Sequence, residues 1–196
     1  MSTLDISQAK SRLLQILRAK SVFHGDFTLA SGAKSTYYID CRLTTLDAEA
    51  AALVGQVIYN LIQQRARELK ITIKGVGGLT MGADPIALAT GMRSFQENPS
   101  QPIQPFVVRK APKSHGQTKL IEGNFKAGDK VVVIDDVVTK GDSTIAAIEA
   151  VKREGGDVAF VVVLVDRQQG GREKIEALGY SVLSAFTKDD LLSPAK

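Results

Sequence analysis

The chain has little cysteine: Cys41 is the only one among 196 residues. A single cysteine excludes an internal disulfide. Cys41 also stands in no metal-ligand spacing, which fits a reducing compartment. We interpret it as a small buried hydrophobic residue.

Long apolar runs are also missing. The longest is Val158–Val165, and a membrane-spanning helix needs about 20 apolar residues. The N-terminus lacks the apolar core of a signal peptide. We therefore expect a cytoplasmic protein with no membrane partner.

Several motifs of nucleotide and metal enzymes are absent. The chain has no Walker A spacing, no metalloprotease pattern and no C-x-x-C pair. The stretch Gly75–Gly78 lacks the third glycine of a dinucleotide fingerprint. The sequence thus gives no support to these classes of enzyme.

The composition is that of a globular protein, with 44% hydrophobic and 23% charged residues. A chain of this length can bury a core without disulfides or a structural metal. We predict one domain over residues 1–196. An N-terminal helix and short strands, which we call the hood, cover about 1–45, and a core sheet covers about 46–186.

Strand and helix patterns alternate after residue 70. The runs Val131–Ile134 and Val161–Val165 are apolar throughout, as in parallel strands that are covered on both faces. This predicts an α/β fold with a doubly wound, mainly parallel central sheet flanked by helices, and a small N-terminal α+β hood lobe. The predicted helices are 8–19, 47–68, 83–95, 143–154 and 172–178. The predicted strands of the core are 73–76, 103–108, 131–134, 158–165 and 180–186, and short hood strands fall within 21–45.

The segment Val131–Thr144 runs from an apolar strand through Asp135 and Asp136 into a polar loop that opens a helix. In an open parallel sheet, ligands bind beyond the carboxyl ends of the strands. A loop leading into a helix N-terminus offers free N–H groups to a phosphate, and Gly141 lets the backbone come close. Carboxylates repel phosphate, but they accept hydrogen bonds from sugar hydroxyls or hold a hydrated Mg²⁺. The segment therefore predicts a ribose phosphate site.

An ordinary strand–turn–helix is the alternative interpretation, with Ser143 and Thr144 as turn and N-cap residues. It does not explain two adjacent carboxylates at a strand end, because these repel each other without a cation or hydroxyls to hold. We therefore favour the ligand site, in which Thr139, Ser143 and Thr144 add hydroxyl donors.

The same segment resembles the phosphoribosyl pyrophosphate motif of type I phosphoribosyltransferases, an apolar strand followed by two acidic residues and a loop rich in Thr and Gly. The resemblance implies that the two aspartates contact the ribose hydroxyls, and that Val138 to Thr144 bind the 5′-phosphate. Lys140 departs from the motif, where the family usually has a small or hydroxyl residue. The predicted binding residues in this segment are Asp135, Asp136, Val137, Val138, Thr139, Lys140, Gly141, Asp142, Ser143 and Thr144.

Three further stretches resemble orotate phosphoribosyltransferases in particular. The first, Phe27–Arg42, is similar to their N-terminal signature and implies that Tyr37 and Tyr38 lie beside the base. On pattern alone, the two tyrosines are equally well explained as ordinary strand residues.

The second stretch is Arg109–Gly116, which resembles the mobile catalytic loop of that family. Donors placed where negative charge develops lower a barrier most, so its cations suit a departing pyrophosphate. A solvated basic loop or a nucleic-acid contact is the alternative, although no aromatic residue interleaves the cations before Phe125. The predicted donors are Arg109, Lys110, Lys113 and His115, and the predicted catalytic residues are Lys113, His115 and Asp136. The resemblance also implies a homodimer that shares loop 109–119 between subunits.

The third stretch, Asp166–Gly171, is similar to one whose arginine holds the orotate carboxylate in that family. A planar guanidinium matches a carboxylate. The alternative is an ion pair of Arg167 with Asp166 at the strand end, which would stabilise little. The predicted orotate site consists of Tyr37, Tyr38, Thr139 and Arg167.

The segment Gly77–Pro85 resembles the family's pyrophosphate loop in position and glycine content. Its predicted contacts are Thr80, Gly82 and Ala83. Some members carry lysines that contact the substrates at the positions of Ala30 and Met81, so here those contacts must be absent or replaced.

The resemblance covers about residues 20–190 and implies an enzyme of pyrimidine synthesis. It would transfer ribose 5-phosphate from 5-phosphoribosyl 1-pyrophosphate to orotate, giving orotidine 5′-phosphate and pyrophosphate. Mg²⁺ is the expected cofactor, with Asp135 and Asp136 as ligands through water and no direct side-chain ligand assured. Two alternatives stay open: transfer to another base, and a non-catalytic regulator that binds nucleic acid on the same fold.

Overall fold

A six-stranded sheet forms the centre of the protein. The structure is a computed structural model that describes residues 4–28, 32, 34–111 and 119–193. The strand order is β5-β4-β3-β6-β7-β8. Within this sheet, as far as it is described, only β5 (Ile121–Gly123) runs antiparallel to its neighbour. The parallel strands are β3 (Gly75–Leu79), β4 (Gln104–Val108), β6 (Lys130–Val138), β7 (Asp157–Asp166) and β8 (Val182–Thr187).

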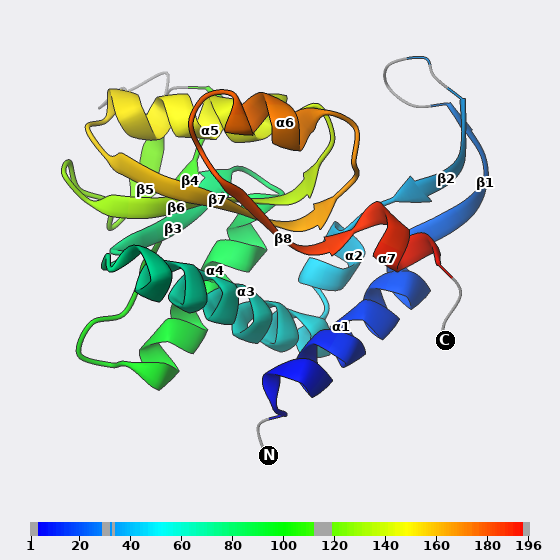
Figure 1. The fold of residues 1–196 in the computed structure, drawn as a ribbon, viewed down its shortest axis with the longest axis horizontal. Coiled ribbons are helices and arrows are strands. Elements are labelled where there is room, and N and C mark those ends of the chain that lie inside the picture. The colour runs from blue at the N-terminus through cyan, green and yellow to red at the C-terminus, as the bar shows by residue number, and fades with distance from the viewer. Residues whose placement is uncertain (1–3, 29–31, 33, 112–118, 194–196) are drawn as a thin grey trace.

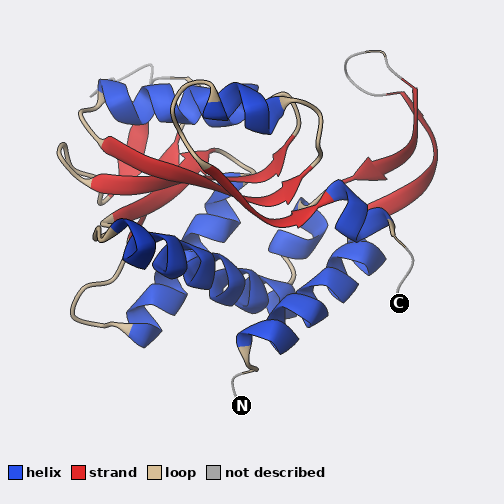
Figure 2. Cartoon of the chain, in the orientation of Figure 1, coloured by secondary structure: helices blue, strands red, loops and turns tan. Residues whose placement is uncertain are grey.

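Helices cover both faces of this sheet (Figures 1 and 2). One face carries α5 (Asp142–Arg153) and α6 (Gly171–Glu176). The other carries α1 (Ile6–Lys20), α3 (Ala48–Leu69) and α4 (Ala83–Glu97). Two further helices, α2 (Arg42–Thr45) and α7 (Lys188–Leu192), are short. No helix in the described ranges is long and apolar enough to cross a membrane.

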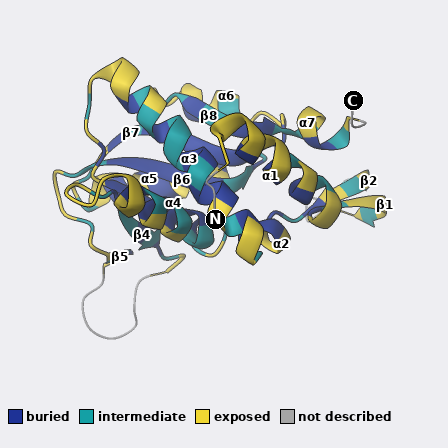
Figure 3. Ribbon diagram, turned by 90° about the horizontal axis from the view of Figure 1, so that it is seen from below, coloured by how far each residue is buried: buried dark blue, intermediate teal, exposed yellow. Residues whose placement is uncertain are grey.

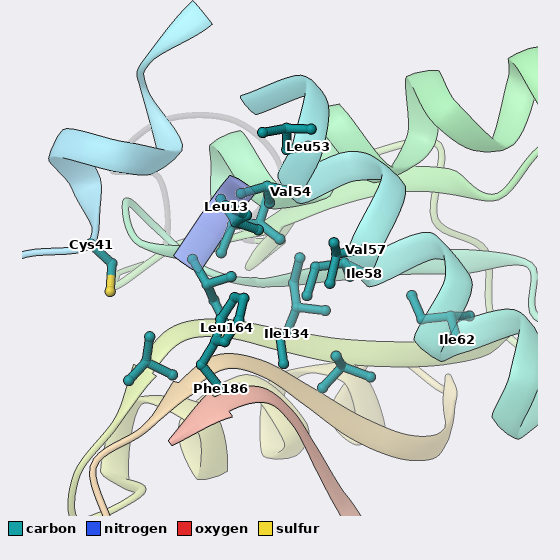
Figure 4. Packing of buried hydrophobic residues seen from close by; sticks show 14 of the residues in the cluster. Leu13, Cys41, Leu53, Val54, Val57, Ile58, Ile62, Ile134, Leu164 and Phe186 are labelled. Atoms are coloured by element: carbon teal, nitrogen blue, oxygen red, sulfur yellow. The ribbon is translucent and has the colours of Figure 1, made fainter. Parts of the chain in front are cut away.

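The apolar strands explain this layering. Side chains alternate along a strand, so Val132 and Ile134 join the core beneath α3, whereas Val131 and Val133 join the core beneath α5. Figure 4 shows α3 presenting Val54 and Ile58 to the sheet. In Figure 3 the central strands β6 and β7 are mostly buried, whereas the hood strands and the outer faces of the helices are largely exposed. The predicted fold class is confirmed.

The hood strands form a sheet of their own. β1 (Val22–Thr28) and β2 (Lys34–Ile39) make an antiparallel pair that projects from the body in Figure 1. α1 joins the core through Leu13 and Leu17. Cys41 follows the hood strands and is buried, as its interpretation required.

The core strands differ from their predicted bounds, β3 and β6 by the most, and β5 was not predicted. The strand expected at 73–76 lies at Gly75–Leu79 and thus includes Gly77 and Gly78, beyond the predicted end. A Cβ on Gly77 would lie 2.1 Å from the carbonyl oxygen of Phe106, and one on Gly78 would lie 2.0 Å from that of Ile134. These glycines therefore allow close strand neighbours. β6 also continues through the two aspartates to Val138, because it pairs with β7 as far as Asp166.

We predict that Gly55→Ala destabilises the fold by about 1–3 kcal/mol, because overpacking forces the backbone to shift. An added Cβ would lie 2.5 Å from the carbonyl oxygen of Ala89, where α3 crosses α4. Chemical denaturation measures the change. Helix propensity alone favours alanine by about 1 kcal/mol, so a stabilised Gly55→Ala would refute the close contact. The control is the reverse change at exposed Ala52 of the same helix, Ala52→Gly, which propensity alone makes destabilising.

Candidate active site

A cleft opens where the strand order reverses. From β3 the chain continues to β4 on one side, and from β6 it continues to β7 and β8 on the other. Ligands of open α/β sheets bind at such a switch point. The cleft has a volume of about 450 Å³. It is lined by Tyr38, Ile39, Asp40, Cys41, Arg42, Leu79, Thr80, Met81, Gly82, Lys110, Asp135, Asp136, Val137 and Ser143.

Asp135 is a buried carboxylate near the end of β6. Its Oδ2 accepts hydrogen bonds from Ser143 Oγ at 2.7 Å and Thr144 Oγ1 at 2.8 Å. Burial raises the pKa of Asp135, and these two bonds oppose the rise. The two hydroxyls therefore tie β6 to the first turn of α5. The N-cap interpretation of Ser143 and Thr144 is wrong, because Gly141 is the N-cap and no side chain caps this helix.

Asp136 stands beside it and faces the loop after β3. Burial, and next the negative charge of Asp135, raise the pKa of Asp136 to about 7. A Cβ on Gly82 would lie 2.5 Å from Asp136 Oδ1, so a glycine allows the loop to approach the carboxylate. The arrangement concentrates negative charge that a cation or hydroxyl groups could stabilise.

The loop between β6 and α5 is backed by the start of α6. Gly141 has φ +80°, a conformation that favours glycine. Gly171 leaves room behind the loop, because a Cβ there would lie 2.5 Å from the carbonyl oxygen of Thr139. Lys174 of α6 pairs with Asp142 at 2.5 Å. Lys140 is exposed at the loop surface. The loop thus presents an uncapped helix N-terminus, which suits an anion.

The basic loop is described only at its two ends. Lys110 lines the cleft. Arg109 instead donates to Glu122 Oε1 at 3.4 Å and to the carbonyl oxygen of Ala111 at 3.2 Å. Lys113 and His115 lie outside the described residues, as does Ala30.

Arg167 is buried at 6% exposure just after β7. Its Nε and Nη2 are buried and have no hydrogen-bond partner within the described part of the chain. Asp166 does not neutralise it: Asp166 Oδ2 accepts from Arg172 Nε at 2.7 Å, and its Oδ1 accepts from the Gln168 N–H at 2.8 Å. The alternative of a strand-end ion pair between Asp166 and Arg167 is therefore wrong.

The two tyrosines of β2 have different surroundings. Successive side chains of a strand point to opposite faces. Tyr38 lines the cleft, with its ring centroid 5.7 Å from that of Phe27. Tyr37 is half-buried and lies beneath Arg167, whose Cζ is 5.3 Å from the Tyr37 ring centroid.

The cleft gathers part of the predicted site. Of the predicted residues, it is lined by Tyr38, Thr80, Gly82, Lys110, Asp135, Asp136, Val137 and Ser143. The described residues that were predicted for the site but do not line this cleft are Tyr37, Ala83, Arg109, Val138, Thr139, Lys140, Gly141, Asp142, Thr144 and Arg167.

Sequence reasoning missed Asp40 and Arg42, which line the cleft as an ion pair. Arg42 donates through Nε and Nη2 to the two carboxylate oxygens of Asp40, both at 2.8 Å. The sequence held one signal for this pair. Asp40 and Arg42 are opposite charges two residues apart, directly after a predicted strand that contains two tyrosines.

Known proteins are similar to this chain in sequence and in fold. The phosphoribosyl transferase domain family matches residues 90–187. The orotate phosphoribosyltransferase of Streptomyces avermitilis is 42% identical over 187 residues, which cover 95% of this chain and 98% of the relative.

A solved structure of Mycobacterium tuberculosis H37Rv orotate phosphoribosyltransferase has a TM-score of 0.79 and 39% identity, covering 94% of this chain and 99% of that one. Another structure of that enzyme, in complex with 5-phospho-alpha-D-ribosyl 1-diphosphate, has a TM-score of 0.72 and 33% identity, covering 94% and 92%. With the cleft at the switch point and these likenesses along nearly its whole length, the chain belongs to the orotate phosphoribosyltransferase family.

Proposed function

We propose that the cleft binds 5-phosphoribosyl 1-pyrophosphate across the β3–β6 switch point. Asp135 and Asp136 would accept hydrogen bonds from the ribose hydroxyls. The loop from Val137 to Thr144 would bind the 5′-phosphate through backbone N–H groups, and α5 adds the positive end of its dipole. The uncapped start of α5 supports this assignment. So does the related Mycobacterium tuberculosis enzyme, which has been solved with this donor.

The pyrophosphate would lie toward the loop after β3. Thr80 and Gly82 line the cleft there, and Ala83 opens α4 behind them. Lys110 brings a cation to the same cleft. Arg109, Lys113 and His115 stay predicted partners of the leaving group, with Lys113 and His115 as catalytic residues. Cations at these positions would stabilise the charge that develops on the departing pyrophosphate.

Arg167 is the proposed anchor of the orotate carboxylate, and its unpartnered nitrogens carry this assignment. A buried guanidinium without hydrogen-bond partners is costly, so two buried N–H groups that have no partner among the described residues suit an anionic ligand. A carboxylate satisfies a guanidinium in bidentate geometry. Tyr38 lines the cleft and would lie beside the base, and Thr139 stays a predicted orotate contact.

Mg²⁺ is the proposed cofactor. No group of three or more His, Cys, Asp or Glu residues that could hold a metal occurs among the described residues. Mg²⁺ typically keeps several waters and binds through one or two carboxylates together with substrate phosphates. The Asp135–Asp136 pair fits that need through water, and the bound ion would neutralise pyrophosphate charge.

The chain's own residues would act mainly by positioning and by electrostatics. The anomeric carbon gains oxocarbenium character as its bond to pyrophosphate breaks, by chemical analogy with glycoside cleavage. The carboxylates hold the ribose, the α5 loop fixes its phosphate, and Arg167 orients the orotate. Aligned reactants lower the entropic part of the barrier. No covalent intermediate with the protein is required.

We also propose that the protein is a homodimer that shares loop 109–119 between its subunits. The proposed location is the cytoplasm. A different acceptor base and a nucleic-acid-binding regulator were the alternatives. Neither is favoured, because the related proteins over nearly the whole chain are orotate phosphoribosyltransferases.

One assay tests the proposed function as a whole. Purified protein should consume orotate, followed by its ultraviolet absorbance, only when both 5-phosphoribosyl 1-pyrophosphate and Mg²⁺ are present. Uracil and the purine bases serve as competing acceptors. Turnover of one of them without orotate consumption would reject orotate as the substrate. Salt-sensitive nucleic-acid binding without any turnover would favour the regulator.

We predict that Asp136→Asn weakens binding of 5-phosphoribosyl 1-pyrophosphate about tenfold or more in the presence of Mg²⁺. An amide keeps the shape but loses the charge that hydroxyl groups and a hydrated cation favour, and bonds to charged groups contribute about 1.5–3 kcal/mol. Calorimetric titration measures the affinity. The matched control is Asp157→Asn. Asp157 is an exposed aspartate at the first residue of β7, the end that lies away from the cleft. Equal affinities of Asp136→Asn and wild type would remove Asp136 from the donor site.

The Asp136 pKa of about 7 also predicts a pH dependence of stability. Between pH 4 and 7 the native carboxyl keeps a proton that the unfolded chain has released. The free energy of unfolding of the unliganded protein therefore falls as pH rises through this window and levels off above it. Asp136→Asn should remove this loss and be more stable than wild type at pH 8 by about 1–3 kcal/mol. Denaturation at pH 5.5 and pH 8 measures it, and a variant with the wild-type pH slope would contradict it.

A further inference from the structure

Arg167 has two buried guanidinium nitrogens without a hydrogen-bond partner among the described residues. Its side chain is buried, and the neighbouring carboxylate of Asp166 is bound to Arg172 and to the Gln168 N–H. Arg172 itself is fixed further, because it donates to the carbonyl oxygen of Val182 at 2.8 Å and to Ser184 Oγ at 3.0 Å. Asp166 is therefore held by Arg172 rather than by Arg167.

The Arg167 guanidinium lies over the ring of Tyr37. The distance from Arg167 Cζ to the ring centroid is 5.3 Å, within the range of a cation–π interaction. Such an interaction is strongest where water is excluded, as around this buried side chain. An aromatic face attracts the cation without occupying its N–H groups, which agrees with Nε and Nη2 having no hydrogen-bond partner among the described residues.

Tyr37 is well placed to hold the guanidinium. It lies on the inner side of β2, half-buried, and packs against the main hydrophobic core. Among the described residues, no hydrogen-bond partner of its hydroxyl is found. The ring, rather than the hydroxyl, is therefore the part of Tyr37 that contacts Arg167.

We propose that Tyr37 is a positioning residue for the base: its ring holds the Arg167 guanidinium in place with two N–H groups turned to the substrate carboxylate. Tyr37 then acts through Arg167 and does not itself contact orotate. This inference rests on the proposed role of Arg167 and assigns separate roles to the two tyrosines, since Tyr38 is the one that lines the cleft.

The competing explanation is that Tyr37 only fills space between the hood and the body. The two explanations differ in what replaces the tyrosine. A phenyl ring preserves the cation–π contact, whereas an aliphatic side chain fills much of the volume without a π face. They differ also in which substrate is affected, because loss of packing has no reason to act on orotate alone.

The experiment compares Tyr37→Phe, Tyr37→Leu and Tyr37→Met by steady-state kinetics, with thermal unfolding as a check on folding. We expect Tyr37→Phe to stay within about twofold of wild type. Tyr37→Leu and Tyr37→Met should raise the KM for orotate about tenfold, as the energy range of a desolvated cation–π contact implies. The KM for 5-phosphoribosyl 1-pyrophosphate and the kcat at saturating orotate should change less than about twofold. The control is Tyr59→Leu, which removes a partly buried tyrosine of α3 from the same core.

A double-mutant cycle with Arg167→Gln identifies the path of the effect. If Tyr37 acts through Arg167, Tyr37→Leu adds little to the KM for orotate once the guanidinium is gone. Three results would overturn the inference if the wild type uses orotate. The first is additive losses in the double mutant, and the second is equal kinetics of the Tyr37→Phe and Tyr37→Leu variants. The third is an equal rise in KM for both substrates. A wild type that neither binds nor consumes orotate would overturn the proposed function as well.

Discussion

The site depends on two hydrogen bonds that join the end of β6 to the start of α5. Asp135 is buried in the strand and accepts hydrogen bonds from Ser143 and Thr144. These bonds satisfy a buried carboxylate that burial would otherwise disfavour. They also set the distance between the carboxylate pair and the helix N-terminus. The proposed contacts to the ribose and to its phosphate both follow from that distance.

Glycines let the other segments come close to this pair. Because they lack a Cβ, Gly78 can lie close to the backbone of Ile134, Gly82 to the carboxylate of Asp136, and Gly171 to the loop at Thr139. A side chain at any of these positions would meet backbone or a carboxylate at 2.8 Å or less. The loop after β3, the end of β6 and the start of α6 thus meet around one cleft.

Much of this architecture could be predicted from the sequence, because fully apolar strands and a carboxylate pair before a glycine loop are local patterns. The boundaries of β3 could not, since glycines ordinarily end strands and only the neighbouring backbones show why they stay inside this one. The partner of Asp166 could not either, because Arg172 reaches it from α6 and binds β8 as well. Adjacent residues such as Tyr37 and Tyr38 are separated by strand alternation, which a motif written in letters does not show.

The proposed contact between Arg167 and the orotate carboxylate has a consequence for the catalytic cycle. The carboxylate of orotate is not altered when its ring nitrogen gains the ribose, so it is present in the substrate, in the transition state and in orotidine 5′-phosphate. A contact to such a spectator group would be about equally strong in all three, which is uniform binding. At Arg167 it would select which base enters and hold that base in line with the anomeric carbon, but it would not promote departure of the nucleotide. Turnover must therefore be driven by groups whose interactions change during the reaction, and those surround the pyrophosphate and the anomeric carbon.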